Sequence, residues 1–162
     1  MATLLEDIDK QSEWLITAFA SDGLKLDYTI RSFIEIDKFF NINTKDGRPV
    51  ANGRLVNNFG NVIFSIGSYV GQTIIKTVPG AYWVTDDRDE QGEITASVVL
   101  PDGSAIWPIE RVINRSQDGP KESVYVYGYH FTKEYHSEPF DKDYWELDGK
   151  IQKSRSPWWK FW

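Results

Sequence analysis

Five carboxylates stand close together in one short stretch of the chain, residues 86–93 (D-D-R-D-E-Q-G-E). They are Asp86, Asp87, Asp89, Glu90 and Glu93. With Asp87 as its first position, the stretch resembles the first half of a calcium-binding loop. The twelfth position requires a bidentate glutamate, but this chain has Val98 there. We therefore expect no calcium site. A solvated hairpin loop and an acidic surface that attracts a basic partner remain as interpretations, and we take the five acids as candidate partner-binding residues.

The sequence lacks a recognisable catalytic or metal-binding motif. Its two histidines, His130 and His136, lie near Glu134, but without cysteine they are too few for a closed zinc site. No H-E-x-x-H motif, G-x-S-x-G elbow, P-loop or dinucleotide fingerprint occurs. We therefore predict no catalytic residue, no metal, no cofactor and no enzymatic activity.

The last stretch, residues 150–162, is basic and aromatic. It carries four cations, no acid and four large aromatic side chains. Lysine and tryptophan together are typical of interfacial membrane anchors, but the stretch is short and Pro157 interrupts a helix. The tryptophans either pack back onto the domain, bind a partner or touch a membrane weakly. We include Trp158, Trp159 and Trp162 among the candidate partner-binding residues.

A glycine-bearing helix is expected at residues 57–76, and the other elements must surround it. Its apolar residues recur at helical spacing over more than half of the circumference, which predicts a buried helix. Gly67 and Gly71 lie one turn apart and each costs roughly 1 kcal/mol of helix propensity relative to alanine. This cost indicates that another strand or helix backbone packs closely against the glycine face.

Two further helices are expected before this one. Thr3 and Glu6 form a T-x-x-E capping box that starts the first helix, and Gly23 suits its end. Asp27 is the expected N-cap of a second helix at residues 28–40. Residues 41–57 are expected to form a loop.

After Pro79-Gly80 the hydrophobic pattern changes to the two-residue period of strands. Strands are expected at residues 81–85, 94–100, 105–107 and 109–114. Asp102-Gly103 suits the tight turn between the second and third of these strands. Residues 123–132 fit a strand or a helix, and we favour a helix. From residue 137 onward the chain is expected to be irregular.

Composition limits the classes of partner. The 162 residues suffice for one domain with a sizeable core, and the net charge is −6. Residues 1–149 carry 14 basic and 24 acidic side chains, a net charge of −10. Such an acidic body argues against binding nucleic acid, because phosphate contacts need a basic surface. The lack of cysteine, of a signal peptide and of a long apolar run predicts a cytoplasmic protein.

Residues 65–74 (S-I-G-S-Y-V-G-Q-T-I) resemble a "GxYxGExI" helix found in small bacterial proteins of uncharacterised function. In that group a glycine and a tryptophan then open a strand, as Gly80 and Trp83 do here. A "DG…P…V" hairpin follows, matched by residues 102–112. Residues 26–37 resemble the second helix of the group, which reads "lDyS…SL..LD". This chain has Gln72 where the pattern has glutamate. The resemblance covers residues 5–130, and it implies the fold and a housekeeping or toxin-immunity role.

These observations predict a single α+β domain at residues 1–149, followed by a basic, tryptophan-rich tail at residues 150–162. N-terminal helices and a buried central helix are expected to pack on a small antiparallel sheet of three to four strands. The expected function is that of a non-catalytic immunity protein that occludes a basic bacterial toxin domain. The alternative is a bacterial housekeeping or small-ligand-binding domain, attached to membranes through its tail in one version. The oligomeric state stays open.

Overall fold

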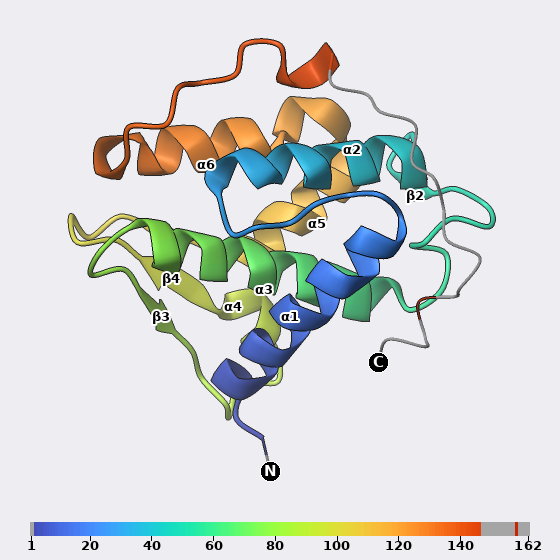
Figure 1. Cartoon of the computed structure of the whole chain (residues 1–162). Coiled ribbons are helices and arrows are strands. Elements are labelled where there is room, and N and C mark those ends of the chain that lie inside the picture. Colours follow the sequence, from blue (N-terminus) through green and yellow to red (C-terminus); the bar gives the residue numbers. More distant parts are fainter. Residues whose placement is uncertain (1, 147–157, 159–162) are drawn as a thin grey trace.

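The computed structural model of the chain describes residues 2–146 and residue 158 (Figure 1). The helices are α1 (Leu4–Ser21), α2 (Phe33–Asn43), α3 (Phe59–Thr77), α4 (Gly92–Thr95), α5 (Pro108–Asp118) and α6 (Val124–Thr132). The strands are β1 (Thr44–Lys45), β2 (Arg48–Pro49), β3 (Tyr82–Val84), β4 (Ser97–Val99) and β5 (Ala105–Ile106). Short 3-10 turns lie at Ile30–Ser32, Gly119–Glu122, Lys133–Tyr135 and Tyr144–Glu146. The predicted α+β class is confirmed, with antiparallel sheets of two and three strands.

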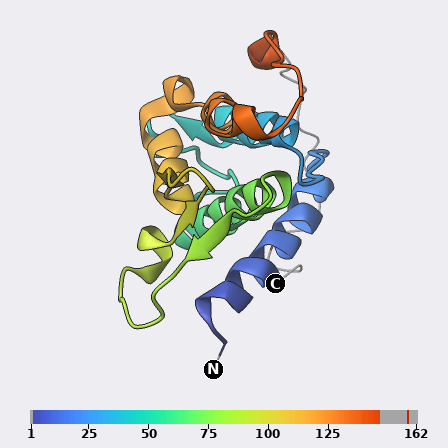
Figure 2. The ribbon, with the colours of Figure 1, turned by 90° about the vertical axis from the view of Figure 1, so that its left-hand side faces the viewer.

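Helix α3 lies at the centre of the molecule. Figure 2 shows it between α1 on one side and α5 on the other. Ile66, Tyr69 and Ile74 of this helix are completely buried. The apolar residues on most of its circumference therefore have packed neighbours, as the hydrophobic pattern predicts.

The two glycines of α3 permit two different close contacts. A Cβ atom at Gly67 would lie 2.8 Å from the Cα atom of Ile109 in α5, so the expected backbone approach is present there. A Cβ atom at Gly71 would overlap the indole ring of Trp83 in β3. At that position the neighbour is a side chain and not a backbone.

The start of the first helix is as predicted, but the start of the second is not. Thr3 caps α1, and the capping box with Glu6 is present. Asp27 does not cap a helix, because its carboxylate accepts hydrogen bonds from the amide and hydroxyl of Thr29. Tyr28 has a φ of +60° and its amide donates to the Tyr69 hydroxyl, at 2.8 Å. This left-handed residue excludes a helix at that point, so α2 begins at Phe33 and extends to Asn43.

Two predicted strand regions are partly or wholly helical. Residues 92–95 form α4, so β4 begins only at Ser97. Residues 109–114 belong to α5, whose first residue is Pro108, where the missing amide hydrogen costs nothing. The strand at residues 82–84, the turn at Gly103 with a φ of +88° and the favoured helix at residues 124–132 agree with expectation. A small β1–β2 hairpin lies within the expected loop.

One buried carboxylate joins three helices. Asp37 in α2 accepts a hydrogen bond from Arg115 Nε in α5, at 3.0 Å. It also accepts from the Ser123 hydroxyl and from the amides of Val124 and Tyr125 at the start of α6. Arg115 is 1% exposed, so this ion pair lies inside the molecule. The pair and the helix cap together hold α2, α5 and α6 in one arrangement.

Candidate functional site

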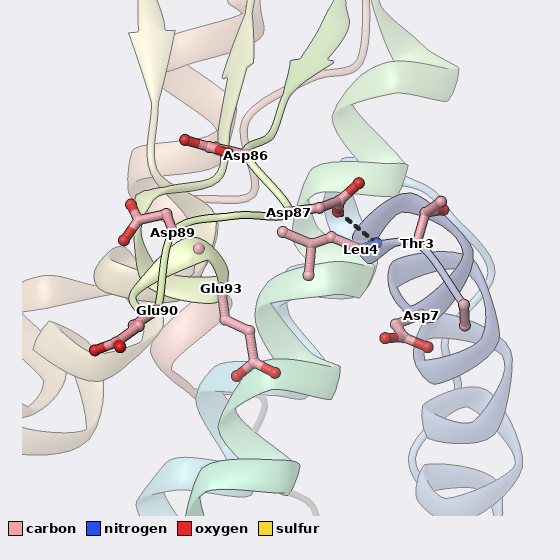
Figure 3. Close-up of a pocket in the computed structure, with 10 residues that line it drawn as sticks. Thr3, Leu4, Asp7, Asp86, Asp87, Asp89, Glu90 and Glu93 are labelled. Atoms are coloured by element: carbon pink, nitrogen blue, oxygen red, sulfur yellow. Dashed lines mark hydrogen bonds between the residues drawn. The ribbon is translucent and has the colours of Figure 1, made fainter.

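All five acids of residues 86–93 line one hollow of about 420 Å³, between their loop and the start of α1 (Figure 3). Helix α1 adds a sixth carboxylate, Asp7. We call this feature the acidic hollow. Asp7 is far from the loop in sequence, and no local pattern indicated that it belongs to the site.

Three of the carboxylates hold the loop in place. Asp87 Oδ1 accepts a hydrogen bond from the Leu4 amide, at 2.9 Å, and so caps the first turn of α1 (Figure 3). Asp86 Oδ1 accepts from the Arg88 amide, at 2.9 Å. Asp89 accepts from the Gln91 amide and from the Thr95 hydroxyl. Substitution of these three residues would therefore disturb the local structure as well as the charge.

The other three carboxylates do not hold the loop through hydrogen bonds. Within the described part of the chain, the side chains of Asp7, Glu90 and Glu93 accept no hydrogen bond and form no ion pair. Figure 3 shows Glu93 on the loop side of the hollow and Asp7 on the α1 side. Partial desolvation, followed by the charge of Asp7, raises the pKa of Glu93 above its ordinary value. The hollow thus holds negative charges that oppose one another.

The described residues include no group of three or more histidine, aspartate or glutamate side chains arranged to hold a metal ion. His136 makes local hydrogen bonds, to the Thr132 hydroxyl and from the Glu138 amide. The His130 ring packs beside Tyr129 and Phe140. The geometry around both histidines is that of local packing contacts.

Gln72 joins three elements through its side-chain amide. Its Oε1 atom accepts a hydrogen bond from the Trp83 indole in β3, at 3.0 Å. Its Nε2 atom donates to Asp9 Oδ1 in α1, at 3.3 Å. A glutamate at this position would keep the first bond but would place a second carboxylate against Asp9. The amide therefore suits this chain, whatever the role of the glutamate in the resembling pattern.

Of the three candidate tryptophans, Trp158 alone lies within the described residues. The residue is 6% exposed, and its ring stacks on Phe39 with centroids 5.6 Å apart and meets Trp14 edge to face. The Arg54 guanidinium lies 5.0 Å above the ring. Trp158 thus packs back onto the core, which leaves little of it for a partner to touch. Trp159 and Trp162 lie outside the described residues.

No protein-family model, no curated protein and no solved structure matches this chain. The resemblance to the small bacterial group therefore stays a prediction. Among the described residues, no helix is both long and apolar enough to cross a bilayer.

Proposed function

We propose that the protein is a non-catalytic binding protein that associates with a basic partner protein through the acidic hollow. The observation that supports this most is the set of carboxylates that have no cation partner among the described residues, Asp7, Glu90 and Glu93. A lysine or arginine of a partner would relieve their mutual repulsion, and the net charge of −6 would steer such a partner towards the protein. The most concrete form of this proposal is an immunity protein that covers the active site of a bacterial toxin.

A charge reversal that spares the loop structure tests the proposal. Glu90→Lys/Glu93→Lys removes no hydrogen bond seen in the described residues, unlike changes at Asp86, Asp87 or Asp89. The probe is the basic protein recovered with the tagged full-length chain from its source cells and then purified. We expect association at low salt to slow by roughly tenfold, with the difference shrinking as salt increases.

The matched control reverses two exposed acids elsewhere, Glu134→Lys/Asp143→Lys. Both residues belong to the segment that follows α6, and Figure 1 shows this segment at the opposite end of the molecule from the start of α1. The control changes the net charge equally, so it isolates the effect of position. Stopped-flow rates that fall equally in both variants would remove the hollow from the proposal.

The small-ligand alternative has a different location. A hollow of about 360 Å³ beside α6 is lined in part by Arg111, Tyr127 and Phe131. The Arg111 guanidinium lies 3.8 Å above the Tyr127 ring, and Tyr127 stacks on Phe131. Lys121 and Glu122 also line the hollow, and Arg111 forms an ion pair with Glu122. Aromatic walls with two cations suit a small aromatic anion that competes with Glu122 for Arg111. Stabilisation by such compounds in a thermal-shift screen, lost in Arg111→Ala, would favour this alternative.

A further inference from the structure

We propose that the outer face of the three-stranded sheet, around Tyr82, Val84 and Trp107, is the apolar part of the docking surface for the basic partner. This inference rests on the proposed function and adds the place where the partner is held. We call this feature the outer sheet face.

The strand register places these side chains on one face. Tyr82 pairs with Val99 and Val84 pairs with Ser97. Continuing the β4–β5 register by one residue beyond Ile106 places Trp107 beside Ser97. Because side chains alternate along a strand, Trp83, Val98 and Ile106 occupy the opposite face. That face is covered, since Val98 and Ile106 are buried and Trp83 packs on Gly71 of α3.

Within the described part of the chain, the large side chains on the outer sheet face have no comparable cover. Tyr82 is 54% exposed, Val84 49% and Trp107 46%. Single exposed apolar residues are ordinary, but three large ones on one small sheet form a patch of the kind that marks an interaction site. Tyrosine and tryptophan are also the residues that most often dominate binding energy at interfaces.

The charges around this face indicate the partner. The acidic loop joins β3 to β4, so it lies at the end of the sheet occupied by Val84 and Ser97. Exposed Glu110 follows Trp107 in the first turn of α5, and exposed Asp102 lies in the turn at the other end of the sheet. An apolar centre with an acidic border is complementary to a protein that presents an apolar side chain among lysines and arginines. Such cations also bind favourably over tyrosine and tryptophan rings.

A second copy of the chain fits this surface poorly. A twofold contact pairs a surface with the same surface of the other copy. Two acidic borders would then meet, and each copy carries a net charge of −6. The occupant inferred here is therefore a basic protein.

Site-specific photocrosslinking in the source cells tests the inference with the full-length chain. p-Benzoylphenylalanine replaces Tyr82, Glu90 or Trp145 in turn; Trp145 is the control, because it is 62% exposed and lies beyond α6. We expect the same basic protein to be attached from the positions of Tyr82 and Glu90 and not from that of Trp145. If the basic protein is crosslinked from the Glu90 position alone, the proposal that it docks on the outer sheet face is overturned, but the proposed function is retained. A second copy or a non-basic protein at the Tyr82 position would also overturn it, and a lack of any basic adduct would overturn both proposals.

Binding measurements with the purified basic protein complete the test. Tyr82→Ala/Trp107→Ala should weaken affinity by at least about 30-fold through faster dissociation, with an unchanged dependence on salt. Trp145→Ala should leave affinity unchanged. Val84→Lys is the second variant, because it adds a charge of the partner's sign without removing an aromatic ring. Unchanged affinity in both sheet variants would overturn the docking face, and slower association in Glu90→Lys/Glu93→Lys would still support the proposed function.

Discussion

Among single residues, Asp37 has a large expected effect on stability. Asp37→Asn removes the charge that faces Arg115 inside the molecule and one acceptor of the α6 cap. Removing one partner of a buried ion pair costs about 3–5 kcal/mol, so we expect a loss of that order. Urea unfolding measures it. Glu35→Gln is the control, because it breaks the partly exposed Lys38–Glu35 pair at 3.5 Å and should cost less than about 1 kcal/mol.

Gln72 allows a second test at this scale. Gln72→Glu places a carboxylate against Asp9 where the amide now donates a hydrogen bond. We expect a loss of about 0.5–1 kcal/mol at low salt, because the pair is near the surface. Asp9→Asn in the same chain should restore most of this loss, which a double-mutant cycle detects. An additive double variant would show that the two side chains do not interact.

The residues of the acidic hollow show what sequence alone can predict of a site. The five loop acids are adjacent in the chain, so composition is enough to find them. Asp7 joins them only because the Leu4 amide binds Asp87, which is 83 residues away in the sequence. The sequence also cannot separate the acids that hold the loop from those that remain available, since that difference depends on which amides lie within reach.

At the scale of elements, the contact between α3 and α5 depends on Gly67. Gly67→Ala gains helix propensity of roughly 1 kcal/mol but drives a methyl group against the backbone of Ile109. We expect a net loss of about 1–3 kcal/mol, the usual cost of overpacking. Gly60→Ala is the matched control in the same helix, because a Cβ atom there meets no neighbour within 4 Å. It should stabilise the protein by up to about 1 kcal/mol, and a similar effect in both variants would contradict the close contact.

Elements whose sequence signal lies in neighbouring residues could be predicted. Segments whose hydrophobic pattern fits both a strand and a helix could not. The capping box of α1, the apolar stripes of α3 and the turn at Gly103 each depend on residues near in sequence. Residues 94–100 alternate as a strand does, yet the first two belong to α4. The expected strands at residues 105–107 and 109–114 lie on either side of Pro108, yet proline is well suited to the first turn of a helix, and α5 begins there. Tertiary contacts decide between such alternatives.

At the scale of the whole molecule, the crowded negative charge should appear in the dependence of stability on pH. The pKa of Glu93 is raised in the folded protein, first by desolvation and then by Asp7. Between its ordinary and its raised pKa the folded state binds more protons than the unfolded chain, so stability falls as pH rises through this window. Glu93→Gln removes that loss. The variant should be more stable at neutral pH and equal to the parent at about pH 3.5, where both states are protonated.

The effect of Glu93→Gln should stay below about 1 kcal/mol, because Glu93 is exposed and solvent screens its charge. Urea unfolding at the two pH values measures the difference. The control is Glu134→Gln, which removes an equal charge at an exposed position away from the acidic hollow. Destabilisation by Glu93→Gln at neutral pH would contradict the repulsion described here.

The cap that Asp37 provides for α6 also imposes an order on folding. Helix α6 has nine residues, fewer than a helix needs to persist alone in water. Its first two amides donate to Asp37, across 87 and 88 residues of chain. Closing so long a loop lowers the entropy of the chain before the contacts that it brings together can stabilise the structure. We therefore expect α6 to form late, on helices already assembled, so that substitutions within it accelerate unfolding and leave the folding rate almost unchanged.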